Sequence, residues 1–303
     1  MSVIQESEVL NRNEWVDWIR HQDGDFGVSS EVVEAKITSE YEKCGIESLV
    51  GHLRFCGAIP EVYTHDSTQE KLYSKYTDVV IHQAYTSIGC DSIVLKERAD
   101  VADVECVTND YSFVADAKAF RLSRTAKNQK DFKIQAMDNW KHGKPFAMVV
   151  CPSYQLPSKS SQIYQQAGAR SVCIATYSHL AVLSKYSEIS SQSKALELLH
   201  EIFLSVDEMN PSKDSVEYWQ IINRTMNRFD PKIKGIWREE KLATIESINH
   251  LKEEALGFMA QERERVMRLS KDEAIKEILK IRKIDNRERA ISSVSDNGLL
   301  KVI

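Results

Sequence analysis

The chain has 303 residues, of which 42% are hydrophobic and 28% are charged, proportions that are ordinary for a soluble globular protein. A chain of this length can form one large domain or two. Its formal net charge of −5 excludes a uniformly basic nucleic-acid binder, so any contact with a polyanion must come from a local patch. The acidic, polar start lacks the pattern of a secretory signal, and no apolar run reaches the roughly 18 residues of a membrane span.

One stretch of the chain is strongly basic. Between Ala117 and Lys144 there are six lysines and two arginines but only two aspartates. The net charge of this stretch is therefore +6, and that of the rest of the chain is −11. A solvated helix face could carry the same charge, so charge alone does not decide between that and a polyanion site. The six cysteines are scattered with no C-x-x-C pair, which indicates core residues in a reducing cytoplasm.

The N-terminal third is expected to be helical. Helical spacing and capping residues predict a short amphipathic segment over 13–19, a helix from Ser29 or Ser30 that Gly45 ends, and a helix over 46–55. A third helix starts at a capping box formed by Ser67 and Glu70 and runs to about residue 85. In a capping box, the Glu70 side chain bonds the backbone at the start of its own helix.

A β-hairpin is predicted over 103–120, because the apolar pattern alternates on both sides of the turn residues 108–110. If Asn109 and Asp110 form a two-residue turn, Asp103 lies directly opposite Asp116. One face then carries Asp103, Glu105, Val114, Asp116 and Lys118, and all of these except Val114 are charged. The other face carries the apolar set Val104, Cys106, Phe113, Ala115, Ala117 and Ala119. A turn of odd length would change this register, and the sequence leaves that open.

The rest of the chain predicts two buried strands followed by helices. A helix is expected over 125–141, buried strands over 145–152 and 171–176 with a short helix at 162–166 between them, and a helix over 178–183. Beyond residue 187 only helices are expected, over 192–206, 214–228, 237–269 and 270–284, before a tail. The long charged segment 237–269 fits a solvated arm, a partner-binding helix or a dimer interface. We expect three parts, 1–60, a core over 61–186, and a helical region over 187–303 packed with the core as one unit.

The chemistry of the hairpin depends on its two aspartates and its lysine. An acid-x-Lys triplet occurs five times in the chain, but only Asp116 and Lys118 lie on a predicted strand, where such residues share a face about 6 to 7 Å apart. Two acids opposite each other repel unless a cation lies between them. Carboxylates without nearby His or Cys favour Mg²⁺, with Asp103 and Asp116 as its ligands. Lys118 could then stabilise developing charge or help position and deprotonate a nucleophile. The alternative is an exposed ion pair beside an unrelated acid.

The polar segment after the strand has the side chains that bind DNA. Arginine and lysine can contact phosphates and guanine edges, asparagine and glutamine can contact adenine edges, and hydroxyls can contact backbone oxygens. The candidates are Arg121, Ser123, Arg124, Thr125, Lys127, Asn128, Gln129 and Lys130. The sequence does not separate base-reading residues from phosphate contacts. It contains no P-loop, G-x-G-x-x-G or G-x-S-x-G motif, which argues against nucleotide cofactor chemistry of those kinds.

Three segments of the chain resemble the HindIII restriction endonuclease family. They are ADAKAFRLSRTAKNQKDFK at 115–133, STQEKLYSK at 67–75 and LKERADVADV at 95–104. The similarity extends from about residue 58 to about residue 184. This resemblance implies a type II restriction endonuclease with a PD-(D/E)xK core, an α/β fold in which helices flank a mixed central sheet. It also implies a homodimer that uses Mg²⁺ and cuts double-stranded DNA at the palindrome AAGCTT after the first A, leaving 5′-phosphate ends.

The same resemblance assigns roles to individual residues. Asp103 takes the place of the first acid, Asp116 that of the second and Lys118 that of the lysine. Ala102 stands where the core motif typically has proline. In many such nucleases a glutamate from a preceding helix joins the site, and Glu70 is the candidate here, with Glu105 as its rival. Two alternative hypotheses about function remain. One is a nuclease of relaxed specificity on the same core, and the other is a DNA-binding protein without catalysis.

Overall fold

The structure, a computed structural model, describes residues 2–96, 101–125, 129–209 and 215–293. The chain divides into two compact units, residues 1–255 and residues 256–303. In the first unit, one hydrophobic core runs through helices and strands from Trp15 to Ile236. The N-terminal helices, the sheet and the first C-terminal helices therefore bury their apolar faces against one another.

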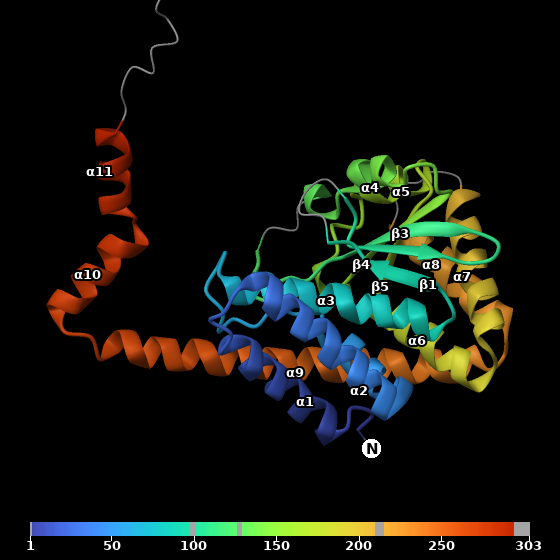
Figure 1. The fold of residues 1–303 in the computed structure, drawn as a ribbon, viewed down its shortest axis with the longest axis horizontal. Helices are drawn as coiled ribbons and strands as arrows, with labels where there is room; N and C mark the ends of the chain where they lie inside the picture. Colours follow the sequence, from blue (N-terminus) through green and yellow to red (C-terminus); the bar gives the residue numbers. More distant parts are fainter. Residues whose placement is uncertain (1, 97–100, 126–128, 210–214, 294–303) are drawn as a thin grey trace, which may run out of the picture. The chain divides into compact units, whose positions relative to one another are not determined.

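A five-stranded mixed sheet lies at the centre of the first unit (Figure 1). Its strands are β1 (Asp91–Val94), β2 (Val104–Val107), β3 (Ser112–Ala117), β4 (Phe146–Cys151) and β5 (Val172–Thr176), and they are paired in that order. Strands β1 to β3 are antiparallel, and β3, β4 and β5 are parallel. Every residue of β4 and β5 is buried, as predicted for strands covered on both faces. The expected α/β class with a helix-flanked mixed sheet is confirmed.

The hairpin of β2 and β3 has the predicted register. Val104 pairs with Ala115 and Val107 with Ser112, so the turn has two central residues. The Thr108 amide donates to the Tyr111 carbonyl at 2.9 Å, which closes the turn. Asp103 precedes β2, and its amide donates to the Ala115 carbonyl at 3.1 Å. The predicted register is thus observed from Val107 to Val104, and Asp103, next to it, bonds Ala115, the residue that pairs with Val104.

Strand β1 was not predicted from the sequence. Its buried position is Ser92, whereas Ile93 is 54% exposed, so the usual alternation of apolar and polar residues is inverted. The strand forms through backbone pairing with β2, in which Asp91 lies opposite Val107. Burial of apolar side chains, the signal on which strand prediction depends, is missing here.

The three N-terminal helices are α1 (Glu6–Arg20), α2 (Phe26–Phe55) and α3 (Thr68–Ser87). Helix α3 packs on the sheet, and α1 and α2 pack on α3. Helix α2 starts earlier than predicted, because the Asp25 carboxylate caps it by accepting from the Val28 amide at 3.1 Å. The expected break at Gly45 is present as a kink with φ of 69°. The start of α3 is confirmed, since Ser67 Oγ accepts from the Glu70 amide at 3.1 Å.

The single helix predicted over 125–141 is wrong. The described part of this segment contains a 3₁₀ turn, η1 (Gln129–Phe132), and then helix α4 (Ile134–Trp140). Lys133 separates them in a left-handed conformation with φ of 49°. Phe132 and Trp140 are both buried, so the apolar spacing matches one helix although the backbone is broken. A further 3₁₀ turn, η2 (Ser153–Gln155), and helices α5 (Ile163–Gly168) and α6 (Tyr177–Ile189) complete this part, and α6 is longer than predicted.

The described part of the chain after residue 189 is helical, as predicted. It contains α7 (Gln192–Asp207), α8 (Ser215–Phe229), α9 (Ile233–Met267), α10 (Lys271–Ile281) and α11 (Ile284–Ser292). The capping box at Ser270 and Glu273 is confirmed. The helix predicted over 270–284 is confirmed as α10 but ends a few residues earlier, and Lys283, with φ of 52°, separates it from α11, which was not predicted. Most of the predicted tail lies outside the described residues.

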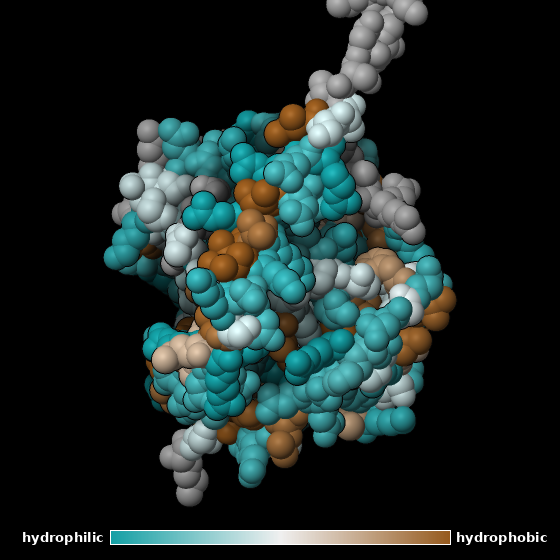
Figure 2. All heavy atoms as spheres, turned by 90° about the vertical axis from the view of Figure 1, so that its left-hand side faces the viewer, coloured by the Kyte–Doolittle hydropathy of each residue, from teal (hydrophilic) through white to brown (hydrophobic). Residues whose placement is uncertain are grey.

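The N-terminal half of α9 is part of the first unit and is not a solvated arm. Ile236, Ala243 and Leu251 are buried, and the α9 residue Glu254 receives two hydrogen bonds from the buried Arg12, at 2.8 and 3.1 Å. In the second unit, no residue of the described range 256–293 is buried. Several of its apolar side chains are exposed, among them Met267 at 79% and Ile281 at 71%. Figure 2 shows such apolar side chains as brown spheres in a mostly teal surface.

Candidate active site

Asp103, Asp116 and Lys118 come together at the end of the hairpin. Asp116 lies on β3 and is 2% exposed. The Lys118 ammonium forms an ion pair with the Asp116 carboxylate. Asp103 Oδ2 accepts from the Ala117 amide at 2.8 Å, which fixes this carboxylate against the strand that carries Asp116. The register predicted from the sequence therefore places both acids and the lysine in one site.

The backbone of Lys118 is held from two sides. Its amide donates to the Val150 carbonyl of β4 at 2.8 Å, and the Tyr177 hydroxyl of α6 donates to its carbonyl at 2.9 Å. β4 is buried along its whole length, and Tyr177 is buried as well. The site therefore rests on rigid elements, which is what precise positioning of reactive groups requires.

A third acid, Asp78 of α3, belongs to the same site. Burial raises the pKa of Asp78 well above its ordinary value, and the negative charges of Asp103 and Asp116 raise it further. Lys75, one turn earlier on α3, has its ammonium 3.8 Å from the Asp78 carboxylate. The sequence analysis missed Asp78. The available signal is its position in the run TDVVIHQAY, where it is the one acidic residue in an otherwise largely buried part of the helix.

When ionised, these three carboxylates carry more negative charge than Lys118 and Lys75 compensate. Burial and the adjacent Asp116 raise the pKa of Asp103 to about 7. Burial would lower the pKa of Lys118, but Asp116 and Asp103 raise it above its ordinary value. Crowded carboxylate oxygens without a His or Cys among them are the donor set that a hard divalent cation takes. The residues present therefore fit Mg²⁺.

The two predicted rivals for a further acid have other partners. Glu70 Oε1 accepts from Arg121 Nη2 at 3.0 Å, and Glu70 Oε2 accepts from the Asp66 amide at 2.6 Å. Its second bond reaches the residue before the helix cap, so the capping box at α3 is only half formed. Glu70 also lies in a group with His65 and Asp66 whose potential ligand atoms are within 4.8 Å of one another. Glu105 Oε2 is 3.0 Å from the Lys144 ammonium.

The predicted DNA-binding segment is anchored by its first residues. Arg121 bonds Glu70 and the carbonyls of Pro60 and Glu61. Ser123 bonds the Glu61 carboxylate through its amide and its hydroxyl at 2.9 and 2.8 Å.

Arg124 pairs with Asp131, and its guanidinium lies 3.9 Å from the centre of the Phe120 ring. Thr125, Gln129 and Lys130 are exposed, and the predicted contacts Lys127 and Asn128 lie outside the described residues.

A hollow of about 840 Å³ opens beside the carboxylates. Residues of α2, α3, the connection from β1 to β2, and α4 line it, and they include both Asp78 and Asp103. Four lysines also line this hollow: Lys71, Lys75, Lys96 and Lys133. Glu31 and Glu34 of α2 line the hollow as well. Lysines beside the site carboxylates suit a ligand that is itself a polyanion and binds together with a cation.

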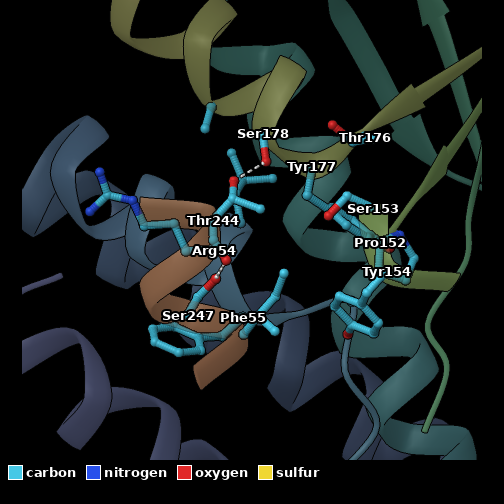
Figure 3. Close-up of a pocket in the computed structure, with 14 residues that line it drawn as sticks. Arg54, Phe55, Pro152, Ser153, Tyr154, Thr176, Tyr177, Ser178, Thr244 and Ser247 are labelled. Atoms are coloured by element: carbon cyan, nitrogen blue, oxygen red, sulfur yellow. Dashed lines mark hydrogen bonds between the residues drawn. The ribbon is translucent and has the colours of Figure 1, made fainter. Parts of the chain in front are cut away.

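A second cavity is too small to be a substrate site. It has a volume of about 30 Å³, room for about one water molecule, and lies where α2, α6 and α9 meet. Figure 3 shows its hydroxyl groups, with Ser178 Oγ 2.7 Å from Thr244 Oγ1 and the Arg54 guanidinium turned away from them. Arg54 instead bonds Glu8 and Glu240 at 2.9 and 2.6 Å. This cavity is a polar packing seam that joins α9 to the core.

A mixed sheet that presents two acids and a lysine at the end of a hairpin is the arrangement expected of a metal-dependent nuclease. Comparison with known proteins defines the family. The chain matches the profile of the HindIII restriction endonuclease family over residues 12–295, and it therefore belongs to that family. The match thus extends well beyond residues 58–184, over which the resemblance was noted from the sequence.

One curated relative is the type II restriction enzyme HindIII of Haemophilus influenzae. It is 41% identical over 133 residues, which are 43% of this chain and 44% of the relative. The aligned region thus spans less than half the length of the relative. Among the residues that the structure describes, no helix is long and apolar enough to cross a membrane.

Proposed function

We propose that the chain is a type II restriction endonuclease that hydrolyses phosphodiester bonds in double-stranded DNA with Mg²⁺, acting in the cytoplasm. Family membership supports the class of reaction. The observation that carries the proposal is the buried Asp116 on a rigid sheet, ion-paired with Lys118 and close to Asp103, whose carboxylate accepts from the Ala117 amide. Because the relative is HindIII, we take the target to be AAGCTT, cut after the first A to leave 5′-phosphate ends.

Each residue of the site has a proposed role in that hydrolysis. Asp103 and Asp116 would hold Mg²⁺ in a PD-(D/E)xK core that occupies about residues 61–186. When bound, the ion neutralises phosphate charge and makes a bound water a better nucleophile. Lys118, whose pKa is raised, stays protonated at neutral pH and stabilises the charge that develops on the phosphate oxygens. Water adds to phosphorus as the 3′ oxygen leaves, which yields the 5′-phosphate end.

The further acid in this site is, in our proposal, Asp78 and not Glu70 or Glu105. Asp78 shares charge repulsion with both Asp103 and Asp116, whereas Glu70 is bonded to Arg121 and Glu105 to Lys144. A helix that packs on the sheet would thus still supply the additional carboxylate, two turns further along than the residue that the sequence suggested.

DNA contact and symmetry complete the proposal. A palindrome has twofold symmetry, so we propose a homodimer in which each subunit cuts one strand. Thr125, Gln129 and Lys130 are exposed and available to DNA. Lys127 and Asn128, which lie outside the described residues, remain proposed contacts from the sequence. Arg121, Ser123 and Arg124 form bonds within the protein and so hold this segment in shape beside the duplex.

Plasmid cleavage tests the proposed function. In Mg²⁺, the wild-type protein should convert one sequenced plasmid into discrete fragments whose mapped ends lie at AAGCTT. Asp116→Ala should abolish cleavage, whereas Asp23→Ala, at an exposed site in the loop before α2, should cut like the wild type. A smear of fragments would support a relaxed-specificity nuclease, and DNA binding without any scission by the wild type would support a non-catalytic binder. Full activity of Asp116→Ala would refute the site.

A further inference from the structure

Lys133 has a backbone conformation that its residue type does not favour. Its φ of 49° and ψ of 33° lie in the left-handed region, where a side chain with a Cβ is strained and glycine or asparagine is usual. Lys133 stands at the cap position of α4, yet its side chain makes no capping hydrogen bond. The lysine therefore contributes nothing to the start of the helix that a glycine would not. Such strain persists where the surrounding structure enforces it, and it concentrates at functional sites.

The Lys133 side chain lies where a substrate would pass. It is exposed and lines the hollow that also contains Asp78 and Asp103. Its ammonium is 5.1 Å from the centre of the Trp140 ring, and this buried indole supports the aliphatic stem from one side. The positive charge of Lys133 offsets a small part of the rise in the pKa of Asp103, which agrees with a position of Lys133 beside the carboxylates.

Lys133 also differs from two other lysines of the hollow in having no acidic partner. Lys75 is 3.8 Å from Asp78, and Lys96 is 3.6 Å from Glu31. Among the ion pairs of the described residues, none involves Lys133. An ammonium that is held by an aromatic ring and aimed at a hollow, but not neutralised, is available for an anion from outside the protein.

We propose that Lys133 binds a phosphate of the DNA backbone next to the phosphate that is cut, with its ammonium donating to a non-bridging oxygen. This inference rests on the proposed function, because it takes the ligand of the hollow to be DNA. Lys133 would then be a phosphate contact that places the scissile bond against Asp103, Asp116 and Lys118. The break between η1 and α4 would exist because an unbroken helix would direct this side chain elsewhere.

Binding of DNA in EDTA isolates this contact from cleavage. Lys133→Met keeps an unbranched stem over Trp140 and removes the charge, and Lys133→Arg keeps the charge. With a duplex of about 30 base pairs, Lys133→Met should bind roughly tenfold more weakly at moderate salt, and the slope of log K against log salt should become shallower by about 0.9. The loss should be equal for a duplex with AAGCTT and a scrambled one. Lys133→Arg should restore most of the affinity, and Lys234→Met, at an exposed position of α9, should change nothing.

Lys133→Gly separates a binding role from a structural one. Glycine adopts the left-handed conformation without strain, so this variant should melt at or above the temperature of the wild type while binding DNA as poorly as Lys133→Met. Wild-type affinity and slope in Lys133→Met, with the wild type still cutting plasmid, would overturn the assignment and leave the proposed function intact. A lower melting temperature in both variants with an unchanged salt slope would make Lys133 structural and equally overturn it. A wild type that neither binds nor cuts DNA would overturn both proposals.

Discussion

Replacing Asp103 with asparagine should make the protein more stable in the absence of divalent ions. The carboxylate of Asp103 is buried beside Asp116 and shares the site with Asp78, so its charge is repelled without full compensation. Asparagine has nearly the same shape, and its carbonyl oxygen can still accept the 2.8 Å hydrogen bond from the Ala117 amide. The substitution therefore removes the repulsion and keeps the local structure.

The pKa of Asp103 sets the size and the direction of the effect. Its value rises from 3.8 to about 7 in the folded protein. Between these values the folded state binds more protons than the unfolded state, so stability falls as pH rises through the window, and the full cost is present above about pH 7. A shift of about 3 units corresponds to about 4 kcal/mol, which is an upper limit because the three acids titrate together. We expect Asp103→Asn to recover about 1 to 4 kcal/mol.

Thermal unfolding in EDTA measures this gain. At about pH 8, Asp103→Asn should melt several degrees above the wild type, and at about pH 5 the difference should shrink to less than half, because the wild-type carboxyl is then protonated in the folded state. Asp23→Asn, at an exposed position, is the control for loss of an aspartate. Mg²⁺ should raise the melting temperature of the wild type more than that of Asp103→Asn. A variant that melts below the wild type at pH 8, or an increment independent of pH, would refute the reasoning.

Three further predictions concern other buried groups. Asp78→Asn should lower plasmid cleavage at least about a hundredfold while Glu70→Gln keeps most of it, and the opposite ranking would make Glu70 the further acid. Arg12→Lys should lower the free energy of unfolding in urea by about 3 kcal/mol, because lysine cannot replace the guanidinium that bonds Glu254, Tyr73 and two backbone carbonyls. An unchanged urea midpoint would contradict this. Burial lowers the pKa of His179 to about 4, so the unfolded state binds more protons below about pH 6.5, and stability should fall by up to about 3 kcal/mol as pH drops to about 4. His179→Gln should remove that part of the pH dependence, which has the opposite sign to that of Asp103, and a variant with the wild-type profile would exclude His179 as its source.

The hairpin was predictable because two independent signals agree there. Alternation of apolar residues identifies the strands, and the turn residues fix the count between them, so Asp103 and Asp116 could be placed in one site. The buried strands β4 and β5 were predictable because they are apolar throughout. Strand β1 was not, because its buried residue is Ser92 and its exposed residue is Ile93. Backbone pairing forms such a strand, and backbone pairing leaves no mark in the sequence.

Asp78 was missed for a different reason. An acid in a helix is normally solvated, and the residues around Asp78 do not reveal that α3 packs its face against β2 and β3. Glu70 was chosen as the candidate because the sequence places it in a capping box. In the structure its carboxylate accepts hydrogen bonds from the Asp66 amide and from Arg121. The third acid follows from the packing of α3 on the sheet, a tertiary fact that helical spacing alone does not contain.

The stretch 115–133 connects these observations. Its strand places Asp116 and Lys118 in the site, and the two arginines that follow are held within the protein, Arg121 by Glu70 and Arg124 by Asp131. Lys133, at the end of the stretch, lines the hollow that contains Asp103. By composition, every polar residue of this segment could bind DNA. In the structure, some of these residues bond within the protein and others are exposed. Mutations in the segment should separate in the same way, with losses of stability at the arginines and losses of DNA affinity at Lys130 and Lys133.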